Sequence, residues 1–130
     1  MKQKITFLTL GVENLEKSIN FYENLLGWKR SDLSNESLII FDLQGLYLSL
    51  YDRNELAKDA TVASSGDGFK GFTLAHNVDS EREVDELINE LRDKGVKIVK
   101  EPQSVFWGGY SSYFSDPDGN LWEVAYNPYL

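Results

Sequence analysis

The stretch SDPDGNLWEVAYNP, residues 115–128, decides the fold of the second half of this chain. It begins with a tight turn at residues 116–119 and continues into a mainly apolar segment, residues 120–127, that is typical of a β-strand. One carboxylate, Glu123, interrupts this segment. Alternation along a strand places Leu121, Glu123 and Ala125 on one face, and Trp122, Val124 and Tyr126 on the other. A single carboxylate in a mainly apolar strand makes Glu123 a candidate functional residue.

The rest of the chain repeats one order of elements twice. Each half is expected to contain a strand, a helix and then three strands, which together make a βαβββ module. In the first half these elements are residues 4–12, 13–27, 28–33, 37–43 and 46–52. In the second half they are residues 71–78, 80–95, 96–100, 110–116 and 120–127. The repetition supports assignments that are weak one at a time.

Both expected helices carry recognisable ends. Asn14 is suited to cap the first helix, and Gly27 is suited to end it in a left-handed conformation. Ser80 and Glu83 form a capping box for the second helix, and Gly95 ends it. The spacing of apolar residues predicts a buried stripe on each helix: Leu15, Ser18, Ile19, Tyr22, Leu25 and Leu26 on the first, and Val84, Leu87, Ile88 and Leu91 on the second.

Residues 52–69 interrupt the repeat. They begin with a helical turn and end in a polar segment rich in serine and glycine, so we interpret them as a linker. The predicted organisation is a single domain, residues 1–130, with module 1 at about 4–51 and module 2 at about 70–127. The predicted fold class is α+β.

The composition excludes several classes of function. The formal net charge is −8 and no basic patch is visible, which argues against nucleic acid and anionic membranes as partners. No apolar run approaches the roughly 18 residues of a membrane helix, and the first residues lack signal-peptide features, so we expect a cytoplasmic location. There are no cysteines, which excludes disulfides, thiolate nucleophiles and cysteine-based metal sites.

Two longer stretches carry a resemblance to a known family. TLGVENLEKSINFYENLLGW, residues 9–28, and GYSSYFSDPDGNLWEVAYNP, residues 109–128, resemble the vicinal oxygen chelate superfamily, in its branch of glyoxalases, bleomycin-resistance proteins and dioxygenases. The resemblance implies that each module curls a mixed sheet into a half-open cup, and that two modules face each other around a cavity. The two modules come from one chain or from two chains of a dimer, and a homodimer is expected.

The resemblance also implies where related metalloenzymes hold one divalent ion. Four His, Glu or Gln side chains on the first and fourth strands of the modules hold it, at positions that match Phe7, Leu48, Thr73 and Glu123. Only Glu123 is a suitable ligand, and transition-metal sites normally take three or more protein ligands. We therefore expect no cofactor. A divalent metal ion is the alternative if the matching is wrong by one residue.

Glu123 is the candidate catalytic residue. In a mostly apolar cavity with Phe7 and Leu48, a lone carboxylate is suited to act as a general base or to anchor a cationic group of a ligand. The other interpretation is a hydrogen-bonded carboxylate at a strand end. His76, the only histidine, lies three residues from Thr73 and so on the opposite face of a regular strand. With another register, His76 and Glu123 would form a two-ligand metal site.

The segment FWGGY, residues 106–110, combines aromatic side chains with two glycines. Trp107 and Tyr110 are suited to cover the mouth of a cavity and to stack on a planar ligand. The other interpretation is a β-bulge with Trp107 in the core. Tyr113 can face either way. The candidate ligand-binding residues are Phe7, Leu48, Thr73, Trp107, Tyr110 and Glu123.

These residues support three hypotheses about function. The first is a metal-independent protein that binds a small organic molecule in an apolar, aromatic cavity, with drug sequestration of the bleomycin-resistance type as the concrete example. The second is a metal-dependent lyase, isomerase or dioxygenase that uses Glu123. The third is metal-free acid–base catalysis by Glu123 with Tyr110 or Tyr113. Whether the protein is an enzyme stays open.

Overall fold

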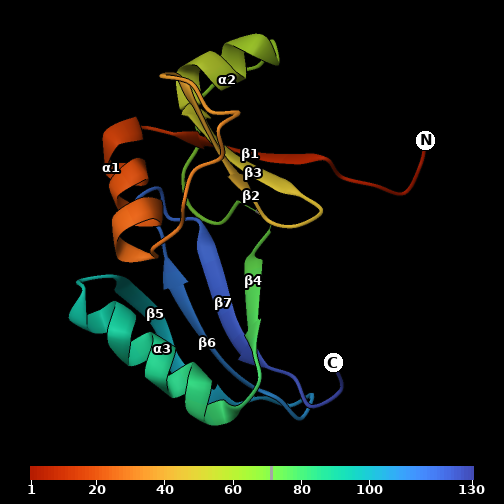
Figure 1. Ribbon diagram of the computed structural model, residues 1–130, viewed down its shortest axis with the longest axis vertical. Helices are drawn as coiled ribbons and strands as arrows, with labels where there is room; N and C mark the ends of the chain where they lie inside the picture. Colours follow the sequence, from red (N-terminus) through yellow and green to blue (C-terminus); the bar gives the residue numbers. More distant parts are fainter. Residues whose placement is uncertain (71) are drawn as a thin grey trace. The chain divides into compact units, whose positions relative to one another are not determined.

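The structure, a computed structural model, describes residues 1–70 and 72–130. The chain divides into two compact units, residues 1–66 and residues 67–130, and each unit has its own sheet (Figure 1). The described residues form a three-stranded sheet in the first unit and a four-stranded sheet in the second. Both sheets mix parallel and antiparallel pairing. This arrangement of sheets and helices confirms the predicted α+β class.

The second unit follows the expected order of elements. It contains β4 (Leu74–Val78), α3 (Glu81–Asp93), β5 (Lys97–Ser104), β6 (Tyr110–Ser115) and β7 (Leu121–Tyr126). The strands lie in the order β4-β7-β6-β5, with β4 parallel to β7 and the other neighbours antiparallel. Helix α3 packs along one face of this sheet (Figure 1).

Helix α3 begins and ends where its sequence predicts. The hydroxyl of Ser80 accepts a hydrogen bond from the backbone N–H of Glu83 at 3.2 Å, and the Glu83 carboxylate accepts one from the N–H of Asp79 at 2.7 Å. Gly95 follows the helix with a φ of 84°, the left-handed conformation that favours glycine. Three residues of the predicted stripe are buried: Val84, Ile88 and Leu91.

The face of the second sheet that α3 covers holds an apolar core. Phe114 of β6 and Trp122 of β7 stack with their ring centroids 6.1 Å apart, and Val124 is fully buried. Because successive side chains of a strand point to opposite faces, Tyr113 and Glu123 project from the other face of the sheet. The core therefore determines which side chains of β6 and β7 face away from the helix.

The first unit is built around a smaller sheet. It contains β1 (Phe7–Val12), α1 (Leu15–Ile19), η1 (Asn20–Leu25), β2 (Leu38–Asp42), β3 (Tyr47–Asp52) and α2 (Arg53–Asp59). The strands lie in the order β1-β3-β2, with β1 parallel to β3 and β2 antiparallel to it. One face carries buried core residues: Leu10, Val12, Ile39, Phe41, Leu48 and Leu50. Tyr22 of η1 packs against Phe41 on this face, with ring centroids 5.9 Å apart.

The first helix has the predicted ends. The side chain of Asn14 accepts a hydrogen bond from the backbone N–H of Lys17 at 3.0 Å, which satisfies one of the free donors of the first turn. At the other end, Gly27 takes a φ of 77°. The two caps that the sequence indicates are therefore both present.

Between these ends the first helix departs from the prediction. From Asn20 it widens into a π-helix, in which the N–H of Leu26 bonds the carbonyl of Phe21, five residues back, at 2.9 Å. The wider turn shifts the buried face by one position. Phe21, which the predicted stripe omitted, is therefore buried beside Tyr22, whereas Leu25 is only half-buried.

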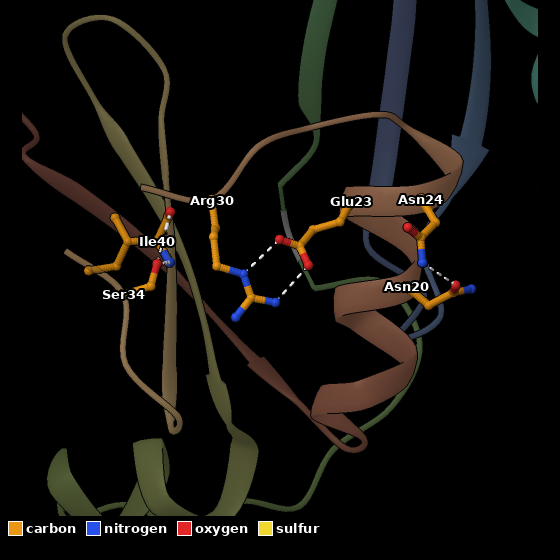
Figure 2. A network of polar contacts seen from close by, with 6 residues as sticks. All are labelled: Asn20, Glu23, Asn24, Arg30, Ser34 and Ile40. Atoms are coloured by element: carbon orange, nitrogen blue, oxygen red, sulfur yellow. Dashed lines mark hydrogen bonds and ion pairs between the residues drawn. The ribbon is translucent and has the colours of Figure 1, made fainter. Parts of the chain in front are cut away.

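Residues 28–33, all of them described, form no strand, which corrects the prediction. The segment lies beside β2 and is held by isolated contacts. The N–H of Ser31 donates to the carbonyl of Ile40 at 2.7 Å. The hydroxyl of Ser34 accepts from the N–H of Ile40 at 2.8 Å and donates to its carbonyl at 3.3 Å (Figure 2). One main-chain bond from Ser31 and the side-chain bonds of Ser34, which follows the segment, therefore take the place of the ladder that a strand would make.

An ion pair joins this segment to the helix. The guanidinium of Arg30 binds both carboxylate oxygens of Glu23, with Nε–Oε2 at 2.7 Å and Nη2–Oε1 at 2.6 Å (Figure 2). The hydrogen bond with Arg30 lowers the pKa of Glu23, against the opposing effect of burial. The same bond raises the pKa of Arg30.

The predicted linker begins with the helical turn that its sequence indicates. Asp52 caps α2 by accepting a hydrogen bond from the N–H of Glu55 at 2.9 Å. Arg53 then holds the following segment, because its Nε donates to the carbonyl of Ser64 at 2.6 Å and its Nη2 to that of Gly66 at 3.3 Å. None of the helices in the described residues is long and apolar enough to cross a membrane.

Candidate functional site

Glu123 lies in the middle of β7, between two other strands of the second sheet. Its register partners are Ala75 on β4 and Tyr113 on β6. Directly opposed residues of paired strands project from the same face. The three side chains therefore share the face that α3 does not cover, together with Leu121 and Ala125, which lie two residues away along β7. We call this surface the Glu123 face.

The phenol of Tyr113 interacts with the carboxylate of Glu123. Burial raises the pKa of Tyr113 above its ordinary value of 10.0, and the charge of Glu123 and a hydrogen bond with it raise this pKa further. A hydrogen bond with Thr73 acts in the opposite direction. A negative neighbour has this effect because it disfavours the charged phenolate. Tyr113 therefore keeps its proton beside Glu123 at neutral pH.

Thr73 completes a polar cluster with these two residues. It directly precedes β4 and lies two residues before Ala75, so it belongs to the Glu123 face. Its side chain is exposed. We call Thr73, Tyr113 and Glu123 the Glu123 cluster. The sequence left open which face of the strand Tyr113 occupies. The one available signal was its apolar neighbour Phe114, which packs on the face that α3 covers and so leaves Tyr113 on the other face.

Tyr110 and His76 lie on the other face of the sheet. The hydroxyl of Tyr110 donates a hydrogen bond to Oδ1 of Asp85 on α3 at 2.8 Å, and this bond is the main cause that raises the pKa of Tyr110. His76 is in register with Val124, which is fully buried beneath α3. Tyr110 therefore does not share a face with Glu123, which corrects the expected grouping of these two residues. His76 lies on the face opposite Thr73 and Glu123, as its spacing predicts, so the alternative two-ligand pairing of His76 with Glu123 is wrong.

Trp107 lies in the hairpin that joins β5 to β6. Two backbone bonds of 3.0 Å close this turn, from Val105 N–H to the carbonyl of Gly109 and from Gly108 N–H to the carbonyl of Val105. The indole ring lies on the backbone of Gly109, where a Cβ atom would stand 1.8 Å from Cζ3 of the ring. The indole is half-buried. Gly109 is therefore the residue that allows Trp107 its position.

Phe7 and Leu48 do not share a face of the first sheet. In the pairing of β1 with β3, Phe7 opposes Tyr47 and Leu8 opposes Leu48. Phe7 stacks on Tyr47 with ring centroids 5.0 Å apart and is 44% exposed, whereas Leu48 is fully buried in the core. This corrects the expectation that both residues line one site, because a shift of one residue exchanges the faces of a strand. The neighbours of Phe7 on its own face of β3 are Tyr47 and Ser49.

The donor groups at these positions do not fit the divalent-metal centre kept as an alternative. Within residues 1–70 and 72–130, no group of three or more His, Asp or Glu side chains could hold a metal ion. Glu123 instead has Tyr113 and Ala75 as its register partners, and neither is a carboxylate or a histidine. On the Phe7 face of the first sheet, the hydroxyls of Thr9 and Ser49 bond each other at 2.7 Å. Neutral hydroxyls are poor ligands for a transition metal.

The turn at residues 116–119 sets the beginning of β7. Asp116, which is 5% exposed, accepts hydrogen bonds from the N–H groups of Asp118 and Asn120 at 2.9 and 2.8 Å, and from the side-chain amide of Asn120 at 2.8 Å. Nζ of Lys70 donates to the carbonyl of Asp118 at 2.9 Å and to Oδ1 of Asn120 at 3.2 Å. This turn leads β7 back along β6 in the register that sets Glu123 opposite Tyr113.

Among the hollows of the described surface, two lie in the first unit and contain no predicted site residue. One, of about 370 Å³, lies between the ends of β1 and β3 and residues 64–66, and Asp52 and Arg53 line it. The other, of about 410 Å³, is lined by residues between 30 and 36. Arg53, which lines the first hollow, donates to the carbonyls of Ser64 and Gly66 and so ties this loop to the start of α2.

Comparison with known proteins agrees with this architecture. The model of the family described as "Glyoxalase/Bleomycin resistance protein/Dioxygenase superfamily" matches residues 4–124. The crystal structure of a glyoxalase-related enzyme from Fulvimarina pelagi is similar with a TM-score of 0.85 and 33% sequence identity, and the match covers 98% of this chain and 90% of that chain.

Two sequence relatives match along nearly the whole chain. "Metallothiol transferase FosB" of Lysinibacillus sphaericus is 34% identical over 121 residues, which cover 93% of this chain and 80% of FosB. "Uncharacterized protein YraH" of Bacillus subtilis is 30% identical over 126 residues, which cover 93% of this chain and 96% of YraH.

Proposed function

Because residues 4–124 match its family model, the chain belongs to the glyoxalase/bleomycin resistance protein/dioxygenase superfamily, and we propose that it binds a small organic molecule without a metal ion. The Glu123 face of the second sheet is the proposed binding surface. The proposal includes a homodimer in the cytoplasm, and drug sequestration is one activity that such binding would serve.

One observation supports this proposal above the others, and it is the strand register that sets Tyr113 and Ala75 on either side of Glu123 on one face of the second sheet. A phenol beside a carboxylate offers a hydrogen-bond donor and an acceptor side by side. Ala75 adds a small exposed apolar neighbour on the same face. A few convergent polar groups among apolar ones are typical of small-molecule sites.

The alternative is a metal-dependent enzyme of the same superfamily, such as a lyase, isomerase, dioxygenase or thiol transferase. The name of FosB, a metallothiol transferase, favours it, at 34% identity to this chain. A metal site at Glu123 would require further ligands beside it. The described residues contain no group of three or more His, Asp or Glu side chains that could hold a metal ion. We therefore place it second.

Calorimetric titration of the chelator-treated, untagged protein with Ni²⁺, Zn²⁺, Mn²⁺ and Fe²⁺, the last without oxygen, separates the two functions. The proposal expects no ion to bind more tightly than about 1 mM, which corresponds to roughly −4 kcal/mol. Glu123→Gln is the test variant, and Glu36→Gln is its control because Glu36 is an exposed carboxylate of the first unit. Tight binding that only Glu123→Gln abolishes would replace the proposal with the metal-dependent alternative.

Binding of organic molecules is measured separately, with a fragment library and backbone amide NMR of the ¹⁵N-labelled chain. We expect the fragments that bind to shift the amide signals of Ala75, Tyr113 and Glu123. Glu36→Gln should leave these shifts in place. Shifts confined to other elements would move the site away from the Glu123 face.

A further inference from the structure

Resting on the proposed function, we propose that the ligand presents a protonated amine to Glu123. It follows from the charges, the neighbouring side chains and the strand register around this carboxylate.

Glu123 is a half-buried carboxylate without a cationic partner among the described residues. The ion pairs among the described residues of both units join other side chains: Arg30 with Glu23, Arg82 with Glu86, Arg92 with Glu101, and Lys94 with Glu90. Its register partners, Ala75 and Tyr113, are neutral. A carboxylate that is partly withdrawn from water, with only neutral neighbours, gains most from a partner that brings a positive charge.

The cationic position closest to Glu123 in the strand register is Lys100. It opposes Tyr113 on β5, and Tyr113 in turn opposes Glu123, so Lys100 lies two strands away. Neighbouring strands are about 4.8 Å apart, which separates the two backbones by roughly 10 Å. In the described part of the chain no ion pair joins Lys100 to Glu123. Lys100 therefore leaves the charge of Glu123 available to a ligand.

The side chains around Glu123 suit an ammonium group in size as well as in charge. Ala75 opposes it on β4 and carries only an exposed methyl group, whereas Ala125, two residues further along β7, is buried. On the third side stands the aromatic ring of Tyr113, whose face attracts cations. An amine placed against Glu123 would therefore meet a carboxylate, an aromatic ring and the exposed methyl group of Ala75.

The charge of the whole protein favours the same class of ligand. The net charge of −8 raises the local concentration of cations near the surface and repels anions. This contribution is screened by salt, whereas a direct contact with a half-buried carboxylate is screened less. Amine binding at Glu123 is therefore expected to persist at high ionic strength.

The test uses pairs of aromatic molecules that differ only in an amine or a hydroxyl group. The probes are 1-naphthylmethylamine with 1-naphthalenemethanol, and tryptamine with indole-3-ethanol, titrated into the ¹⁵N-labelled full chain at neutral pH. Each amine should bind about tenfold more tightly than its alcohol, a ratio that corresponds to about 1.4 kcal/mol. Glu123→Gln should remove this ratio, whereas Glu36→Gln, which removes the same charge from the first unit, should keep it.

The outcomes separate this inference from the proposed function. Equal affinity of an amine and its alcohol on the Glu123 face would overturn the inference and leave the proposed function standing, and so would an amine preference that survives Glu123→Gln. If neither pair binds, the inference fails, and the metal titration decides the proposed function independently. The amide spectrum of Glu123→Gln shows whether that variant is folded, and Glu123→Asp, which keeps the charge, should retain part of the preference if Gln disturbs the sheet.

Discussion

Tyr113 and Glu123 oppose each other on two neighbouring strands, and the pKa of the Tyr113 phenol depends on the Glu123 carboxylate. Burial, the charge of Glu123 and the hydrogen bond with it raise the pKa of Tyr113 above 10.0. The contribution of Tyr113 to the phenolate absorbance is the difference between the wild type and the Tyr113→Phe variant. We predict that this difference appears with a midpoint above pH 10.0. The same difference, measured between Glu123→Gln and the double variant with Tyr113→Phe, should have a lower midpoint because the negative charge of Glu123 is gone.

The measurement is the near-ultraviolet absorbance of each parent minus that of its Tyr113→Phe variant, followed as the pH rises. The pKa of Tyr113 is higher in the folded than in the unfolded protein. The protonated phenol therefore contributes stability below the unfolded pKa, and this contribution is lost as the pH rises through the folded pKa. A midpoint that Glu123→Gln does not change would show that the carboxylate does not act on the phenol.

The pair of Arg30 and Glu23 gives a second prediction at the scale of residues, at acid pH. The folded pKa of Glu23 is lowered by the bond with Arg30, so the pair stabilises the protein above the unfolded pKa and loses this effect as the pH falls through the folded one. Both side chains are partly exposed, so Glu23→Gln should lower the free energy of unfolding by only about 0.5 kcal/mol near neutral pH.

Urea unfolding of the wild type and Glu23→Gln across a pH series measures this effect. The difference between the two proteins should narrow as the pH falls below the ordinary glutamate value of 4.5. The same narrowing is expected between Arg30→Gln and the wild type, because either change removes the pair. A difference that stays constant down to low pH would mean that the ion pair is not its cause.

At the scale of elements, the hairpin between β5 and β6 depends on the contact of Trp107 with Gly109. Gly109 has no positive φ, so an alanine there adds no backbone strain and acts only through its Cβ. That atom would stand 1.8 Å from Cζ3 of the indole. We predict that Gly109→Ala displaces the ring and costs about 1–3 kcal/mol of unfolding free energy, as overpacking does.

A double-mutant cycle checks this prediction through denaturant unfolding and the indole N–H signal of Trp107 in NMR spectra. In a Trp107→Ala background, Gly109→Ala should cost almost nothing, because the atom that it would meet is gone. An equal cost in both backgrounds would assign the effect to the turn and not to the ring.

Several elements could be read from the sequence because local chemistry determines them. Asn14 and Ser80 each accept a hydrogen bond from the backbone N–H of the residue three positions later, as their types and spacing predict. Gly27 and Gly95 take positive φ at the ends of the same helices. The failures arise where a neighbouring strand decides the structure. Residues 28–33 meet β2 through one main-chain bond from Ser31, and the hydroxyl of Ser34 makes the next bonds to Ile40, so no ladder forms.

At the scale of the whole molecule, the strand orders leave β1 and β4 at the edges of their own sheets. An edge strand presents backbone groups that its own sheet does not pair, and these favour pairing with another strand. Apolar residues near these strands are also exposed, with Phe7 at 44% and Phe72 at 41%. We predict a homodimer, so light scattering coupled to gel filtration should give twice the mass of one chain. A single-chain mass at all concentrations would contradict this prediction.

The sequence by itself determined the order of elements in the second unit, the helix caps, the turn before β7 and the position of Glu123 along its strand. These features depend on contacts between residues close in the chain, such as those of Asp116 with Asp118 and Asn120. Hydrogen bonds and backbone preferences over a few residues are the same in any fold, so the residue types were enough to predict them.

Only the tertiary structure decided which residues share a face. Strand alternation has a period of two, so one residue of register exchanges the two faces, and register depends on the neighbouring strand and on what packs against the sheet. The stack of Phe114 on Trp122 turns Tyr113 toward Glu123, and the pairing of Leu8 with Leu48 separates Leu48 from Phe7. The Glu123 cluster exists because long-range packing, which no local pattern records, set these registers.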